Sequence, residues 1–183
     1  MIAELGLLRP IKDDELRMML SWRNAPAVRS NMYNRHEITE ADHFLWWEKV
    51  CSCPDLIYFM YEYQGTPRGI VAFTGVDKES RNTSWAFYAS PDAPRGTGSR
   101  MEFLAVDYAF DTLELHKIYC EVLATNPSVI HLHQKFGFRI EGVLREQHLF
   151  DGEFIDVYRL GLLTLEWQSR REDIRMRLVQ RKR

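Results

Sequence analysis

The sequence predicts an α/β (α+β) fold with a mixed, mostly antiparallel sheet of about seven strands and helices on both of its faces. Two observations lead to this prediction. Short apolar runs typical of strands occur along the whole chain, and segments with apolar residues at spacings of three and four lie between some of them. The length of 183 residues suits one domain, residues 1–183, with a substantial core.

The sequence of the first part of the chain predicts one strand followed by two helices, with a loop between the helices. Residues 5–11 form the strand, and a helix follows over residues 13–23 until Pro26 stops it. Residues 28–37 are polar and aromatic without a clear period, so we expect a loop there. The second helix starts at Thr39, whose hydroxyl can cap its first turn.

Three consecutive strands follow, over residues 55–63, 68–76 and 81–90. Turn residues separate them, so we expect an antiparallel meander. A glycine-rich loop then leads into a helix that begins near Ser99 and buries one apolar face.

A strand over residues 117–123 precedes the next helix. Asn126 caps this helix, and Pro127 occupies its first position, where a missing amide costs nothing. Gly137 ends it.

The C-terminal part predicts a hairpin and a last helix. Residues 138–149 and 153–163 form the hairpin, which turns at the Asp-Gly pair of residues 151–152. A helix starts at Thr164, and its arginine-rich end, residues 170–183, is expected to be solvated and frayed.

Composition excludes several classes of function. The net charge of −2 gives no reason to expect nucleic acid as a partner. No apolar run approaches the roughly 20 residues that span a bilayer, and the charged N-terminus is unlike a signal peptide. We therefore expect a cytoplasmic protein without a membrane partner. The three cysteines do not have the spacing of a zinc site, and His131 and His133 are two apart on a helix, so we expect no metal.

The loop over residues 90–99 reads Ser-Pro-Asp-Ala-Pro-Arg-Gly-Thr-Gly-Ser. Gly96 and Gly98 permit a positive φ and a close backbone approach, and the first amides of the following helix point toward the loop. Arg95 and Arg100 add charge at either edge. A pyrophosphate fits such a loop, and a solvated turn rich in proline and glycine is the alternative.

Two motifs, together with the order of elements, resemble the GNAT superfamily of N-acetyltransferases. The pyrophosphate loop of that family reads Arg/Gln-x-x-Gly-x-Gly/Ala, and the segment from Arg95 to Arg100 matches it at all but the last position. The family's second motif joins Asn, an aliphatic–aromatic pair and Gly-Phe, as does the segment from Asn126 to Phe138. The resemblance covers essentially the whole chain. It implies the GNAT fold and acetyl-CoA as co-substrate.

Within the superfamily, the chain resembles most the amino-sugar N-acetyltransferases of pseudaminic acid biosynthesis, the PseH type. The similarity lies in residues 22–26, 32–33, 43–44, 121–122 and 153–157. It implies direct transfer, in a ternary complex, to the 4-amino group of a UDP-linked amino-deoxy sugar of the UDP-4-amino-4,6-dideoxy-N-acetyl-altrosamine type. Such a product serves flagellin glycosylation. The assembly stays open, with a homodimer among the options.

The resemblance also implies which residues hold the coenzyme. A backbone amide of the strand ending at residue 90 stabilises the oxyanion, the glycine loop holds the pyrophosphate, and the second motif lies beside the pantetheine arm. The expected contacts are Phe87, Tyr88, Ala89, Arg95, Gly96, Thr97, Gly98, Ser99, Arg100, Asn126, Ser128 and Lys135.

Acetyl transfer to an amine needs a neutral amine, a stabilised oxyanion and a proton for the departing thiolate. The family's acid is usually a tyrosine, and His133 stands at its position, either as a proton donor with an ordinary pKa of about 6.5 or as a packing residue near coenzyme A. Glu121 and His43 are both candidate bases. The alternatives are an ordinary paired carboxylate for Glu121 and a core histidine for His43.

Arginines and aromatic side chains in the first two helices and their loop favour an anionic acceptor over a polyamine, which would need a groove lined by carboxylates. Two other functions stay open, a protein N-terminal acetyltransferase of the ribosomal-protein type and a non-catalytic acyl-CoA sensor. The expected acceptor contacts are Arg23, Asn24, Arg29, Met32, Tyr33, Trp47, Thr74 and Tyr88.

Overall fold

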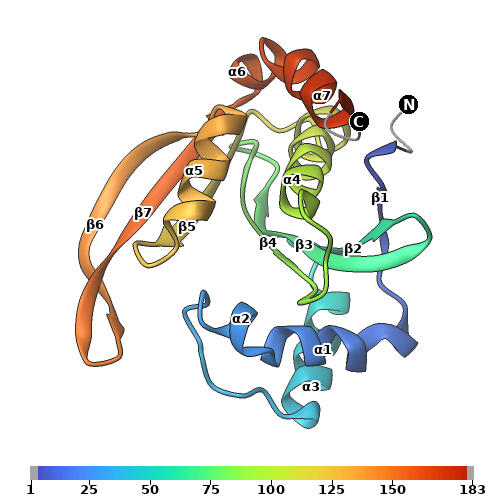
Figure 1. Cartoon of the computed structure of the whole chain (residues 1–183), viewed down its shortest axis with the longest axis vertical. Coiled ribbons are helices and arrows are strands. Elements are labelled where there is room, and N and C mark those ends of the chain that lie inside the picture. Colours follow the sequence, from blue (N-terminus) through green and yellow to red (C-terminus); the bar gives the residue numbers. More distant parts are fainter. Residues whose placement is uncertain (1–3, 181–183) are drawn as a thin grey trace.

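The computed structural model describes residues 4–180, and its centre is a seven-stranded sheet with the order β1-β2-β3-β4-β5-β7-β6 (Figure 1). All neighbouring strands are antiparallel except β4 and β5, which are parallel. The mixed sheet that the sequence predicts is confirmed. The strands are β1 (Leu7–Pro10), β2 (Leu56–Tyr63), β3 (Thr66–Asp77), β4 (Asn82–Ala89), β5 (Lys117–Leu123), β6 (Arg139–Phe150) and β7 (Glu153–Leu163).

Helices cover both faces of the sheet, and α1 and α3 lie apart from α4 to α7 (Figure 1). None of the helices within residues 4–180 has the length and apolar character to cross a membrane. The helices are a 3-10 turn (Asp13–Glu15), α1 (Leu16–Asn24), α2 (Pro26–Arg29), α3 (Glu40–Ser52), α4 (Thr97–Asp107) with a π-helical extension (Tyr108–Thr112), α5 (Pro127–Phe136), α6 (Thr164–Gln168) and α7 (Arg171–Gln180).

Alternation along the central strands divides the core between the two faces. Tyr61 and Trp85 pack with α4 to α7 in the larger cluster, whereas Met60 and Ile70 pack with Met19 of α1 in the smaller one. Because β2 and β3 contribute to both clusters, this part of the sheet is covered on both sides, as its apolar composition predicts.

Local capping and turn chemistry follow the sequence closely. The Thr39 hydroxyl accepts a hydrogen bond from the Asp42 amide at 3.1 Å, at the start of α3. Gly137 ends α5 in the left-handed conformation, with φ of 100°. Asp151 and Gly152 both have positive φ, which suits the two-residue hairpin turn between β6 and β7.

Some local predictions were wrong. Pro26 stops the first helix as predicted but also starts α2, since proline suits a first helical position, so residues 28–29 of the predicted loop are helical. The side chain of Asn126 does not cap α5, because its Oδ1 accepts a hydrogen bond from the Ser128 hydroxyl instead. The C-terminal helix is not frayed where the structure describes it, because Arg171 pairs with Asp107 at 2.6 Å. Its predicted last residues, 181–183, lie outside the described range.

A split opens within the sheet between β4 and β5. The two strands pair only from Asn82 to Ser84 on β4 and from Lys117 to Tyr119 on β5. Both strands continue beyond these residues, β4 to Ala89 and β5 to Leu123, so they diverge. The split therefore exposes two strand edges in the middle of the sheet.

Candidate active site

The glycine-rich loop enters α4 through Gly96, whose φ of 89° is left-handed. The amide and the hydroxyl of Thr97 both donate to the Pro94 carbonyl, at 3.1 and 2.7 Å, so the Thr97 side chain shapes the loop and is not free to meet a phosphate as expected. Across residues 4–180, the amides of Gly98 and Ser99 form no backbone hydrogen bond. Two adjacent free amides at a helix N-terminus form an anion site.

The charged edges of this loop differ in exposure. Arg95 is exposed, whereas the Arg100 guanidinium lies 4.4 Å above the Tyr63 ring. Arg100 Nη1 is buried, with no hydrogen-bond partner among the described residues. Gly98 does not have the positive φ that the sequence allowed, and a Cβ there would make only an ordinary contact with Phe87 at 3.4 Å. These residues fit a coenzyme pyrophosphate.

Strand β4 directs alternate amides into the split. The Ser90 amide donates to the Arg68 carbonyl on β3 at 2.9 Å. Because bonding direction alternates along a strand, the Tyr88 amide also faces β3, and the amides of Phe87 and Ala89 face the split. Of the three residues expected to hold the oxyanion donor, only these two direct their amides correctly.

His133, at the position of the family's tyrosine, is 3% exposed and lies against Glu102 of α4. Its Nδ1 is 2.9 Å from Glu102 Oε1, and Glu102 itself is 0% exposed. Burial alone lowers the pKa of His133, but the Glu102 carboxylate and the Cys120 thiol raise it to about 10. At neutral pH this imidazole is therefore charged and can act as an acid, unlike an ordinary histidine.

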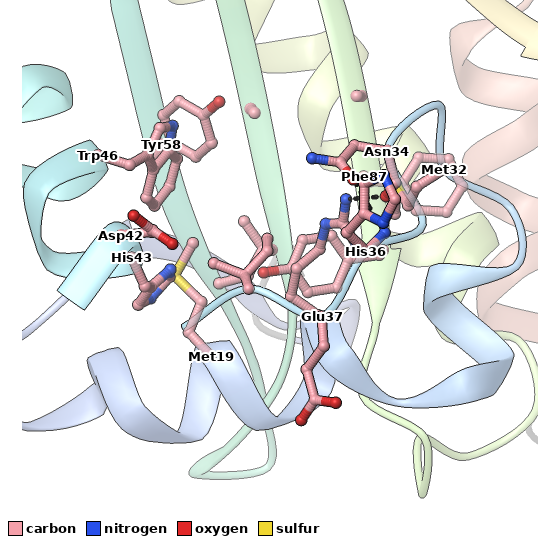
Figure 2. A pocket seen from close by; sticks show the side chains of 16 residues that line it. Met19, Met32, Asn34, His36, Glu37, Asp42, His43, Trp46, Tyr58 and Phe87 are labelled. Carbon is pink, nitrogen blue, oxygen red and sulfur yellow. Dashed lines mark hydrogen bonds between the residues drawn. The ribbon is translucent and has the colours of Figure 1, made fainter. Parts of the chain in front are cut away.

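A cavity of about 580 Å³ lies on the face of the sheet that carries α1 and α3; we call it the acceptor cavity (Figure 2). Its walls are largely aromatic and sulfur-containing, with Trp46 and Tyr58 at one end and Met32, His36 and Phe87 at the other. The lining also includes Met19, Arg23, Asn34, Glu37, Asp42, His43 and Tyr88.

Two buried polar atoms in the acceptor cavity have no hydrogen-bond partner among residues 4–180, Arg23 Nη1 and His43 Nε2. Burial lowers the pKa of both side chains, so His43 is neutral at pH 7. Both cavity carboxylates, Glu37 and Asp42, are exposed, and Figure 2 shows that of Glu37 pointing away from the rings of Trp46 and Tyr58. The interior is thus largely apolar, and one nitrogen of the half-buried Arg23 guanidinium reaches into it without a partner among the described residues.

A second cavity of about 540 Å³ lies between α2, the loop that follows it and the β6–β7 hairpin. Arg29, Arg35 and Tyr33 line it, and His36 lines both cavities. The Tyr33 hydroxyl donates to Glu121 Oε2 at 2.8 Å, which ties the loop to β5 beside the split. Burial and this carboxylate raise the pKa of Tyr33 well above its ordinary value.

Several expected site residues lie elsewhere. Trp46, not Trp47, faces the acceptor cavity, since neighbouring helical residues point about 100° apart. Asn24 is occupied by two hydrogen bonds to the Ile38 backbone, at 2.8 and 2.9 Å, and holds the loop rather than a ligand. Thr74 lines neither cavity. Ser128 and Lys135 are exposed on α5.

Sequence reasoning missed Glu102, Trp46 and His36. Glu102 had a signal, because it is the only charged residue between Arg100 and Asp107 in an otherwise apolar helix. No feature of the sequence indicated that the loop after α2 would bring His36 into the acceptor cavity. No cluster of three or more His, Cys, Asp or Glu side chains that could bind a metal ion occurs within the described part of the chain.

Residues 7–139 match the acetyltransferase (GNAT) domain family. The chain belongs to this family. Its fold agrees, since it superposes with a TM-score of 0.84 on spermidine N-acetyltransferase from Vibrio cholerae in complex with CoA and spermine, at 25% identity over 88% of this chain and 97% of that one. This GNAT chain is an acetyl-CoA-dependent N-acetyltransferase, as the sequence predicts.

Relatives of this acetyltransferase differ in their acceptors. Spermidine N(1)-acetyltransferase of Vibrio cholerae is 31% identical over 167 residues, which are 90% of this chain and 96% of the relative. Acetyltransferase PseH of Campylobacter jejuni is 22% identical over 130 residues, 71% of this chain and 80% of the relative. By identity and coverage, the similarity to the spermidine enzyme is greater than the similarity to the PseH type.

Proposed function

We propose that this enzyme acetylates the 4-amino group of a UDP-linked amino-deoxy sugar, the reaction type of the PseH acetyltransferases. The observation that carries the proposal is the buried Nη1 of Arg23 in the acceptor cavity, which has no hydrogen-bond partner within residues 4–180. A buried N–H donor without a partner is costly until a ligand accepts from it, and more so when it belongs to a charged group. A phosphorylated or carbonyl-bearing acceptor supplies that partner.

The apolar and aromatic walls support the same acceptor. Tyr58, Tyr88 and Trp46 offer flat surfaces on which a nucleobase or a sugar ring can pack. The cationic lining of the second cavity, with Arg29 and Arg35, also suits negative charge on the acceptor.

Polyamine acetylation is the second candidate function, and two observations favour it. The spermidine enzyme of Vibrio cholerae is the more similar relative. In addition, Glu37 and Asp42 place carboxylates on the rim of the acceptor cavity. Against it, a spermidine molecule that entered the cavity would bring its ammonium groups next to Arg23 without a buried carboxylate to pair with them.

We propose the following roles in the reaction. The acceptor nitrogen attacks the thioester carbonyl, and the amides of Phe87 and Ala89 hold the oxyanion. The carbon–sulfur bond then breaks, and His133 gives the thiolate its proton. The coenzyme's pyrophosphate lies against the amides of Gly98 and Ser99. Acetyl-CoA supplies the acetyl group.

Glu121 is the better candidate for the base that takes the proton from the acceptor ammonium. It lies on β5 beyond the last pair with β4, so it borders the split. His43 stacks on Trp46, with ring centroids 5.3 Å apart, at the far end of the acceptor cavity from Phe87 (Figure 2). We therefore propose His43 as an acceptor-binding residue.

We also propose that residues 1–183 form one catalytic domain. The family match ends at residue 139, where β6 begins, so β7 and nearly all of β6 lie outside it. However, β7 pairs with β5 along seven residues and completes the same sheet. The loop after α2 contacts their hairpin through the ion pair of Arg35 and Asp151.

The test is an acceptor panel with purified protein and acetyl-CoA, in which the release of free thiol is followed. The panel contains a UDP-linked 4-amino-4,6-dideoxy-N-acetylhexosamine, the same sugar without UDP, spermidine and a peptide with a free N-terminus. We expect the highest kcat/KM with the UDP-linked sugar, a loss of at least tenfold without UDP, and competitive inhibition by UDP.

A higher kcat/KM with spermidine would replace the proposed acceptor by a polyamine. A higher value with the peptide would make the enzyme a protein acetyltransferase. Measurable coenzyme A binding without thiol release from any acceptor would indicate a sensor.

A further inference from the structure

A carboxylate and an imidazole are buried together beneath the split. Glu102 of α4 is 0% exposed, His133 of α5 is 3% exposed, and Oε1 lies 2.9 Å from Nδ1. Glu102 Oε2 has no hydrogen-bond partner in the described part of the chain. The pair is therefore incompletely satisfied.

Such a pair is poorly explained by stability alone. Desolvation of two charges offsets most of their attraction, and an apolar pair of similar volume is often at least as stable. An orphaned carboxylate oxygen adds to the cost. The surroundings of His133 are otherwise apolar, so a hydrophobic residue would suit both positions.

The pair lies where the thioester sulfur is expected. The His133 ring packs against Trp85 and Phe87 of β4, with centroids 5.3 and 6.1 Å away, and against Cys120 of β5. These residues follow the last paired residues of the two strands. His133 thus lies beside the start of the split, where the Cys120 side chain also hydrogen-bonds with its ring. Its Nδ1 faces Glu102, so a proton for the sulfur would have to come from Nε2.

We propose that Glu102 is a positioning residue that holds His133 as an imidazolium oriented to protonate the departing coenzyme A thiolate. In this step the carbon–sulfur bond breaks, its electron pair stays on sulfur, and sulfur takes the proton from Nε2. The neutral ring keeps its proton on Nδ1, and this N–H remains hydrogen-bonded to Glu102. Solvent reprotonates Nε2 between turnovers. This proposal rests on acetyl transfer by the site but not on the identity of the acceptor.

The electrostatics agree with this geometry. The titratable groups that face the ring are Glu102 from α4 and Cys120 from β5, and its other neighbours are aromatic. Burial raises the pKa of Glu102, while the pull of His133 opposes that rise. Because the pKa of His133 itself is raised to about 10, the pair retains one proton across neutral pH.

The test compares pH profiles of kcat for wild type, Glu102→Gln and the control His131→Gln, which changes an exposed histidine of the same helix. We expect the alkaline limb of the wild type near pH 10. Glu102→Gln should move it toward roughly 6.5, the ordinary histidine value, which lowers kcat about 100-fold at pH 8.5. The KM for acetyl-CoA should stay within twofold, and the control should match the wild type.

Nitrogen NMR of the wild-type protein provides a test that needs neither an acceptor nor an active variant. With the His133 signal identified through its loss in His133→Gln, both ring nitrogens should be protonated at pH 8. A neutral ring at that pH overturns the proposal, and so does an unshifted alkaline limb in a folded Glu102→Gln variant. A protonated ring in an enzyme that rejects UDP-linked sugars would leave this proposal standing and refute the proposed acceptor alone.

Discussion

Replacement of Arg23 by methionine tests the charge of the acceptor cavity directly. Methionine retains most of the side-chain volume but removes the guanidinium, whose Nη1 is buried without a partner. The change should therefore weaken the binding of an anionic acceptor and leave acetyl-CoA binding intact.

The magnitude follows from the contacts. A hydrogen bond with a charged partner contributes about 1.5–3 kcal/mol, which corresponds to an increase of about 10-fold to 140-fold in the KM of the acceptor. In the free protein, the variant loses the 2.8 Å hydrogen bond from Nη2 to the Asn34 carbonyl but also loses a buried charge. These effects oppose each other, so the free energy of unfolding should change by no more than about 1 kcal/mol.

The assay measures kcat and KM for the UDP-linked sugar by thiol release, together with chemical denaturation. Arg17→Met is the matched control, because Arg17 lies on the same helix with its side chain 76% exposed and paired with Glu40. An acceptor KM within twofold of wild type in Arg23→Met would refute the reasoning. The same variant should improve the acetylation of spermidine.

Three further predictions concern stability and are measured by chemical denaturation. Gly69→Ala should lower the free energy of unfolding by about 1–3 kcal/mol, because the new Cβ would lie 2.7 Å from a carbonyl oxygen of the neighbouring strand. An unchanged denaturation midpoint would show that the two strands move apart at little cost. Trp167→Phe should cost about 1–3 kcal/mol, since it removes the 2.9 Å hydrogen bond to Asp107 and leaves a gap in the core, and a neutral effect would contradict this. The hydrogen bond from Arg9 lowers the pKa of Glu15. The loss of unfolding free energy in Glu15→Gln should therefore be greatest near pH 7 and disappear as the pH falls below the ordinary carboxyl pKa of about 4.3. A loss that does not depend on pH would contradict this prediction.

The sequence predicts local features of this fold well because they depend on neighbouring residues. Short apolar runs bounded by turn residues define β2 to β4, the Asp-Gly pair defines the last hairpin, and Gly137 ends α5. The glycine loop is predictable for the same reason, since a left-handed Gly96 and a following helix are encoded within a few residues.

The rest of the site depends on contacts between distant residues. Glu102 and His133 are 31 positions apart, and nothing local indicates that they meet. Trp46 and Trp47 are equally aromatic, so the sequence leaves the rotation of α3 undecided, and packing on Tyr58 settles it in favour of Trp46. The identity of the acceptor is harder still to predict, because it depends on the balance of charge in a cavity that two helices, three strands and a loop share.

The divergence of β4 and β5 has a consequence for hydrogen exchange. Within residues 4–180, only three residue pairs join β4 to β5, so the amides of Phe87 and Ala89 have no strand to donate to. Charged residues or bulges usually prevent the outer edge strands of a sheet from pairing with other strands. An edge inside the sheet has no such protection, and its amides exchange with solvent unless something covers them. Hydrogen exchange at Phe87 and Ala89 should therefore slow when coenzyme A binds, because the proposed coenzyme site covers this edge.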